Sequence, residues 1–351
     1  SVMRKVLFVF AAGAALAMVS CSKDETSSLN TGDGIAFRSA MGTRAQETTI
    51  NNLESFKVTA LTDTGTPYFT DAVFTKQSVS GTTGSFTSDP VYYWPATGSL
   101  SFYAYAPSTL SGVTIDNTTK SVIVTPSTTI ADQIDFITAN ANGNKSNNEG
   151  AGVPLEFKHR LSQIEVKAKN TNNAYIYLVK GVKIGSVASS GTFDFSNSSW
   201  QQGNEKTDYK VEYNTAITLD DNAQTIMTKI SEVADNAMLI PQTLSKWDPS
   251  TDPTNTNGNS FLSVLVNIKT KDGAQVYPET ADAYGWAAVG INTTWAENTK
   301  YIYTLDFSKG AGNVDPDEEH GGDEIFGEPI IFDVTVKGWE PADPQPDDVE
   351  M

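Results

Sequence analysis

The side chains that carry most enzyme chemistry are scarce in this chain and lie far apart. Its 351 residues include two histidines, His159 and His320, and a single cysteine, Cys21. No serine–histidine–aspartate pattern, no paired thiol nucleophile and no histidine–cysteine spacing typical of zinc can be read. Neither a phosphate-binding loop nor a dinucleotide-binding motif occurs. The sequence therefore predicts a protein that is not an enzyme and that holds no metal or other cofactor.

Acidic side chains gather near the C-terminus, where they could bind calcium. They are Asp315, Asp317, Glu318, Glu319, Asp323 and Glu324. Their spacing does not match a known calcium-binding loop, in which ligands recur at fixed alternate positions. We interpret them as solvated charges.

Aromatic side chains form a second group, made of Tyr92, Tyr93, Trp94, Tyr103 and Tyr105. Aromatic faces can bind sugars. At alternating positions beside prolines, however, they are typical of core and cross-strand packing. We favour the core interpretation and keep a glycan platform as the alternative.

Cys21 ends an apolar leader and is predicted to be a lipid attachment site. Arg4 and Lys5 form a short positive region, and the run 6–19 after them contains no charge. A helix needs roughly 20 residues to span a bilayer, so this run is typical of a signal peptide. Residues 18–21, MVSC, resemble the lipobox of bacterial lipoproteins. This resemblance implies a signal peptide over 1–20 and acylation of Cys21 by fatty acids such as palmitate, which would anchor the protein to the outer membrane.

Residues 21–34 are predicted to be an acylated, flexible tether because they are small and polar. The segment SKDE at 22–25 resembles the surface-export signal of Bacteroidetes lipoproteins and implies a surface-exposed lipoprotein; a plain solvated tether is the alternative. The formal net charge of the chain is -18. A surface of this sign repels phosphate backbones, so we expect no nucleic-acid partner.

Alternation of apolar and polar residues over short runs predicts an all-β fold. Such runs occur at 56–60, 100–106, 164–168 and 262–268, and clusters of Gly, Pro, Asn and Asp bound them. The polar segment 140–152 is predicted to separate two domains. We therefore predict an N-terminal β-sandwich domain over 35–150 and a C-terminal one over 151–340, in tandem and built of antiparallel sheets.

The end of the chain combines a predicted linker with an apolar strand. Residues 308–328 are rich in glycine and acids and are expected to be a flexible linker. A terminal strand follows over 329–339, and an acidic, proline-rich tail covers 341–351. The strand's apolar residues are Ile330, Phe332, Val334 and Val336. It could close its own sandwich or complete the sheet of a neighbouring molecule by β-strand addition.

Several motifs, taken in order, resemble the fimbrillin family of Bacteroidetes, the Mfa-like fimbrillins. They are IAF at 35–37 with TRA at 43–45, VYYWP at 91–95, LSFYAYAP at 100–107, LEFKHRLS at 155–162, LIPQ at 239–242, YIYTL at 301–305, and IFDVTV at 331–336 with Trp339. One position departs from the family, since Asn298 stands where a glycine is frequent. Asparagine also tolerates the left-handed conformation, so the turn there is still expected.

The resemblance implies two transthyretin-like β-sandwich domains and export as a lipoprotein precursor. In polymerising members a protease cuts after an arginine, removes the first strand and opens a groove for a donor strand. Carried onto this chain, Arg44 is the first candidate cleavage site and Arg38 the second, residues 35–44 would be the removed strand, and 329–339 would be the donor.

These expectations define a structural fimbrial (pilus) subunit that serves cell adhesion. Its partners would be other fimbrial subunits, through self-assembly, and the outer membrane, through the lipid on Cys21. A host or glycan ligand is a further possible partner. The alternatives are a monomeric surface lipoprotein that binds a glycan or host ligand, and a fimbrial tip or anchor protein.

Overall fold

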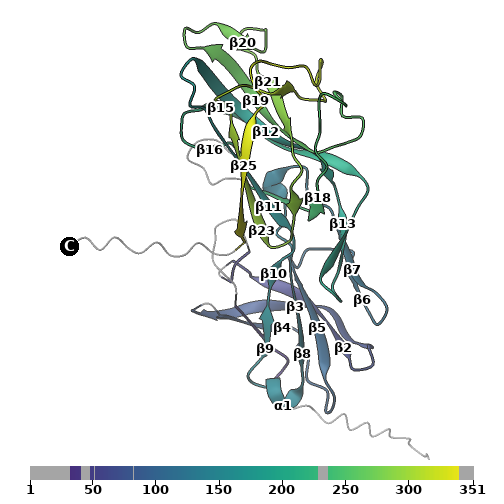
Figure 1. Cartoon of the computed structure of the whole chain (residues 1–351). Helices are drawn as coiled ribbons and strands as arrows, with labels where there is room; N and C mark the ends of the chain where they lie inside the picture. Colours follow the sequence, from purple (N-terminus) through teal and green to yellow (C-terminus); the bar gives the residue numbers. More distant parts are fainter. Residues whose placement is uncertain (1–31, 41–47, 51, 82, 228–235, 340–351) are drawn as a thin grey trace, which may run out of the picture. The chain divides into compact units, whose positions relative to one another are not determined.

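The computed structural model describes residues 32–40, 48–50, 52–81, 83–227 and 236–339. The described residues from 33 onward form one compact unit, which we describe by itself. The predicted all-β class is confirmed, because strands in several sheets make up almost all regular structure in the described residues (Figure 1). No helix among them is both long and apolar enough to span a bilayer.

The first sheet has eight strands in the order β10-β8-β5-β2-β3-β4-β1-β9. They are β1 (Phe37–Ala40), β2 (Ser55–Thr62), β3 (Pro67–Ser80), β4 (Thr83–Ser88), β5 (Leu100–Ala106), β8 (Ile137–Gly143), β9 (Val153–Glu156) and β10 (Lys158–His159). Alternate residues of these strands point to one side. There they form a core rich in phenylalanine, including Phe37, Phe56, Phe74, Phe86 and Phe102.

The segment 140–152 connects two strands of this sheet. It contains the end of β8 and the short helix α1 (Lys145–Asn148), and it leads directly to β9. Because β8, β9 and β10 all belong to the first sheet, the predicted boundary at residue 150 does not separate the sheets. A polar loop between strands of one sheet has the same composition as a linker between domains, which explains the difference.

A second, four-stranded sheet joins segments from both sides of residue 150. Its strands are β6 (Thr114–Ile115), β7 (Lys120–Val124), β13 (Gly191–Asp194) and β14 (Ser199–Gln202), and β7 pairs with β13. Phe136, Phe193, Phe195 and Trp200 pack beside it.

Two larger sheets build the rest of the unit around one buried cluster. One has the path β15-β12-β19-β21-β24, with β20 paired to β19. Its strands are β12 (Tyr175–Ala188), β15 (Lys206–Thr218), β19 (Phe261–Thr270), β20 (Gln275–Tyr277), β21 (Gly285–Gly290) and β24 (Asn313–Val314). The other has the path β16-β11-β23-β25, with β17 paired to β11. Its strands are β11 (Ser162–Lys169), β16 (Gln224–Thr225), β17 (Ala237–Leu239), β23 (Thr299–Asp306) and β25 (Ile331–Gly338). A two-stranded ladder, β18 (Gln242–Thr243) with β22 (Thr294–Trp295), and a 3-10 turn at Ile130–Asp132 complete the elements.

The sheets are mainly antiparallel, as predicted, with two parallel pairings that we did not expect. β1 runs parallel to β9, and β11 runs parallel to β23. Parallel neighbours require a long connection between the paired strands, so local turn signals give no sign of them. Asn298 has a φ of 53°, which confirms the left-handed turn expected before β23.

Candidate functional site

β1 is a four-residue strand that lies between β4 and β9 and separates them. Phe37 stands opposite Phe86 in the antiparallel pairing with β4. It also stands opposite Val153 in the parallel pairing with β9. Because β1 bonds to both neighbours, its loss would leave a row of unpaired N–H and C=O groups on each of them.

The side chain of Phe37 lies in the apolar core of the first sheet. It is 1 % exposed, and its ring centroid lies 4.6 Å from that of Phe74 and 5.1 Å from that of Phe102, both edge to face. Ile35, two residues earlier, is buried in the same cluster. β1 therefore closes both the hydrogen bonding and the apolar core of the first sheet.

The chain from Thr48 onward is held by contacts other than the strand pairings of β1. The backbone N–H of Thr48 donates a hydrogen bond to Asp135 Oδ2 at 2.7 Å, and Ile50 and Leu53 are buried in the phenylalanine core. The residues before and after segment 41–47 are thus held by different contacts. A break within that segment would leave the downstream contacts intact.

The predicted processing and lipidation residues fall in different parts of the chain. Cys21 and Arg44 lie outside the described residues, as do the signal peptide and the tail at 341–351. Arg38 lies on β1 with an exposed side chain, but its backbone is paired on both sides. A protease binds its substrate as an extended free strand, so Arg38 would have to leave the sheet before cleavage.

β25 is the edge strand of its sheet and pairs in antiparallel register with β23 over its whole length (Figure 1). Its predicted apolar face is covered unevenly. Ile330 is buried just before the strand, Phe332 and Val334 are half-buried against the core, and Val336 is 58 % exposed. The candidate donor residues are therefore in place in cis, with incomplete burial.

The end of β25 is fixed by an aromatic stack. The buried ring of Trp339 lies parallel to the imidazole of His159, with centroids 4.4 Å apart and an angle of 2°. His159 Nδ1 lies 2.9 Å from Asp135 Oδ1. His159 is a half-buried residue of the short strand β10, and Asp135 links it to Thr48.

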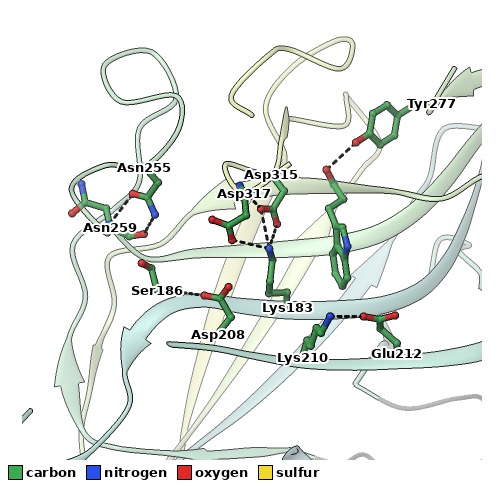
Figure 2. A network of polar contacts seen from close by, with 11 residues as sticks. Lys183, Ser186, Asp208, Lys210, Glu212, Asn255, Asn259, Tyr277, Asp315 and Asp317 are labelled. Carbon is green, nitrogen blue, oxygen red and sulfur yellow. Dashed lines mark hydrogen bonds and ion pairs between the residues drawn. The ribbon is translucent and has the colours of Figure 1, made fainter. Parts of the chain in front are cut away.

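The segment 308–328, expected to be a flexible linker, is packed against the sheet of β12 and β19. It contains β24, which pairs with β21. Figure 2 shows Lys183 of β12 pointing at two acids of this segment, with Nζ 2.8 Å from Asp315 Oδ2 and 3.0 Å from Asp317 Oδ2. Asp315 is fully buried, so its interpretation as a solvated charge is wrong. The composition of the segment predicted a flexible linker, because composition cannot show that Asp315 has a partner, Lys183, 132 residues away.

Asp208 of β15 lies next to this ion pair and accepts a hydrogen bond from the Ser186 backbone N–H at 2.8 Å (Figure 2). Burial raises the pKa of its carboxyl, the Ser186 bond and Lys183 oppose this, and Asp315 and Asp317 add to the rise. The folded protein therefore keeps this proton to a higher pH than the unfolded chain does, in which an aspartate has a pKa of about 3.9.

Asp208→Asn is expected to make stability less dependent on pH. In the wild type, the free energy of unfolding should fall as pH rises from about 4 through the raised pKa, because the folded state binds more protons there. Asparagine still accepts the Ser186 bond but does not ionise, so this part of the fall should disappear. Urea unfolding across that pH range measures it, with the exposed Asp272→Asn as the matched control. Identical slopes for wild type and Asp208→Asn would contradict the prediction.

The core interpretation of the aromatic group is confirmed for its central members. Trp94 and Tyr105 are buried, and the Tyr105 hydroxyl donates to Asp71 Oδ1 at 2.8 Å. Neither ring can serve as a sugar platform in this state. On the surface, Tyr93 and Tyr68 are exposed, with the Tyr68 hydroxyl donating to the Tyr93 carbonyl at 2.8 Å.

Sequence reasoning missed Arg160, which lies between β10 and β11 where the chain leaves the first sheet. Its guanidinium donates to Thr138 Oγ1 at 2.7 Å and to Glu297 Oε1 at 2.7 Å. It also lies over the Phe193 ring, 5.2 Å from the centroid. The only signal was its place in the motif at 155–162. Among the described residues, no group of three or more His, Cys, Asp or Glu is placed to hold a metal ion.

This chain is similar to known proteins in sequence and in fold. A family model described as "Fimbrillin-like" matches residues 43–339. The chain belongs to the fimbrillin-like family. The match confirms the resemblance seen in the motifs, and it begins after β1 and ends at Trp339. None of the curated proteins matches the chain in sequence.

Two of the solved structures that match share the fold of this fimbrillin-like chain at low identity. A protein of Parabacteroides distasonis, proposed to act in cell adhesion, is 12 % identical, with a TM-score of 0.51 and coverage of 90 % of this chain and 99 % of its own. A protein of Bacteroides ovatus, also proposed to act in cell adhesion, is 14 % identical, with a TM-score of 0.50 and coverage of 89 % and 99 %. The tip fimbrial protein Mfa3 of Porphyromonas gingivalis matches with a TM-score of 0.38, 10 % identity and coverage of 87 % and 100 %.

Proposed function

We propose that this chain is a structural subunit of a surface fimbrium and joins its neighbours by β-strand addition. The observation that carries the proposal is the position of β1. This short strand completes the first sheet between β4 and β9, while the chain after Thr48 is held by separate contacts. A cut in the segment 41–47 would allow β1 to leave without unfolding the rest.

The opened gap would accept a strand from another molecule. Backbone groups of β4 and β9 would be free for pairing, and the site of Phe37 would be an apolar pocket. β25 suits this gap because it is an edge strand with apolar residues at alternate positions. Burying an apolar side chain of this size contributes about 1.5–3 kcal/mol, and Phe332, Val334 and Val336 are incompletely buried in cis.

Within this proposal, Cys21 carries the lipid, residues 1–20 are the signal peptide, and the precursor is exposed on the outer membrane before assembly. The two domains are proposed to be transthyretin-like β-sandwiches in tandem. Membership of the fimbrillin-like family supports assembly with other fimbrial subunits and a role in adhesion.

Processing tests the proposal directly. We expect mature protein from cells to begin at Ala45 and to form ladders on gels run without boiling. Arg44→Ala should keep the lipidated Cys21 as the first residue and should abolish the ladders. Arg38→Ala is the matched control and should leave both unchanged, because Arg38 is paired in β1. Ladders that persist in the Arg44→Ala, Arg38→Ala double variant would contradict the proposal.

A second candidate function is that of a monomeric lipoprotein, or a tip protein, that binds a glycan. The exposed rings of Tyr68 and Tyr93 favour it, since the Tyr68 ring is held in place by its hydroxyl. Saturable binding to a sugar array that is lost in Tyr93→Ala, with folding retained, would support this function. The sugar would then bind to Tyr93 at the surface and not to Trp94 or Tyr105, which are buried.

A further inference from the structure

Lys183 and Asp315 are in contact, and both side chains are buried. Lys183 lies on β12 between Val182 and Ile184, which belong to the core, so its side chain projects from the opposite face of the sheet. Its Nζ lies 2.9 Å from Asp315 Oδ1 and 2.8 Å from Oδ2. The side chain of Lys183 is 8 % exposed and that of Asp315 is fully buried.

Aromatic rings and a second acid surround the pair. Nζ of Lys183 lies 5.3 Å from the centroid of the Phe261 ring and 5.5 Å from that of Trp286. Asp317 Oδ2 lies 3.0 Å from the same Nζ, and the Asp317 backbone N–H donates to Asp315 Oδ1 at 3.0 Å. An amine, a carboxyl group and a second carboxyl that can relay protons thus meet in one place (Figure 2).

We propose that Lys183 and Asp315 become joined by an intramolecular isopeptide bond. The Nζ lone pair attacks Cγ of Asp315, and a new N–C bond forms while one C–O bond of the carboxyl breaks. The departing oxygen takes the acid proton and one amine proton and leaves as water. The product is an amide, and no oxidant, reductant or further reactant takes part.

The surroundings supply what this condensation needs. Burial lowers the pKa of Lys183, but the attraction of Asp315 and Asp317 outweighs burial, so Lys183 starts as the ammonium. Moving one proton from Lys183 to Asp315 gives the amine and the acid that react, and burial lowers the cost of this transfer because it penalises both charges. Asp317 is placed to carry protons from Nζ to the leaving oxygen, and its backbone N–H can stabilise the oxyanion on Oδ1.

Proximity favours the reaction, because groups that are held in contact avoid the entropy cost of being brought together. The same chain contains a matched pair that lacks this setting. Lys269 Nζ lies 2.7 Å from Asp282 Oδ1, but the side chain of Asp282 is 84 % exposed. Water keeps that pair charged, so we expect no bond there.

The bond would cross-link β12 to the segment that leads to β25, closing a loop between residues 132 positions apart. Cys21 is the only cysteine, so no disulfide within the chain could do this. A permanent tie at residue 315 leaves the residues after it, including β25, free to move. The inference therefore does not depend on β-strand addition.

Mass spectrometry of the folded full-length chain tests the inference. We expect a branched tryptic peptide that contains both Lys183 and Asp315, is one water lighter than its two parts, and shows no cleavage after Lys183. Lys183→Arg keeps the charge and should give only linear peptides, and Asp317→Asn should leave a larger unlinked fraction at early times. Lys269 and Asp282 should appear in linear peptides in every variant.

Linear peptides alone from wild-type protein, shown by circular dichroism to be folded, would overturn the inference and leave an ion pair. That result would not affect the proposed fimbrial function, which rests on β1 and β25. Conversely, loss of gel ladders in Arg44→Ala should leave the branched peptide in place.

Discussion

Phe37→Ala is expected to lower the free energy of unfolding by about 3–5 kcal/mol, the usual range for removing a buried phenylalanine. The ring contacts Phe74 and Phe102 edge to face, with Phe56 slightly farther away at 6.0 Å between centroids. A methyl group would leave a cavity in a core of rigid rings that cannot collapse easily. Chemical denaturation followed by tryptophan fluorescence measures the loss, because Trp94 packs on Phe102 in the same core.

Arg38→Ala is the matched control for this experiment, since Arg38 is the next residue of the same strand and its side chain is exposed. We expect its effect to stay within about 0.5 kcal/mol. Equal effects of the two substitutions would show that β1 contributes only through its backbone. A large effect of Phe37→Ala alone would mean that the core below β1 needs the Phe37 ring, so a replacing strand must fill the same space.

Arg160→Leu is expected to cost about 3 kcal/mol at neutral pH, because it leaves the Glu297 carboxylate half-buried without its counterion. The loss of the hydrogen bonds to Thr138 and Ser198 adds to this cost. Thermal or urea unfolding measures the change. The loss of stability should be largest where the chain passes from the first sheet to β11. The rate of amide hydrogen exchange should therefore rise most in β10 and β11.

The cost of Arg160→Leu should depend on pH in a defined direction. Burial raises the pKa of Glu297, and the charge of Arg160 opposes the rise. Without Arg160 the pKa should rise further, so the folded variant takes up a proton at a higher pH than the unfolded chain does. The loss of stability should therefore shrink as pH falls through that pKa.

The double variant Arg160→Leu, Glu297→Gln provides the control, because it removes both charges. It should recover part of the stability at neutral pH and should lack the pH dependence of the single variant. If the single variant costs the same at acid and neutral pH, the Glu297 charge is not the cause. The cost would then come from the hydrogen bonds and from the contact with Phe193.

Local pattern in the sequence was sufficient for the strands and for parts of the core. Alternation at 56–60 and 100–106 predicted β2 and β5, because a period of two residues places apolar side chains on one face whatever the partner strand is. The conformation of Asn298 was also predictable, since it depends on one residue type and its own backbone. The motifs identified the family because their order covers most of the matched range.

Only the tertiary structure decided which strands are neighbours. Alternation gives the face of a strand and says nothing about its partner, so the position of β1 between β4 and β9 was not readable from residues 37–40. The same reason explains why the strand pairings next to 140–152 and within 308–328 were not readable from the sequence. A polar segment is a linker or an ordered loop according to partners far away in the chain, and for Asp315 that partner is Lys183.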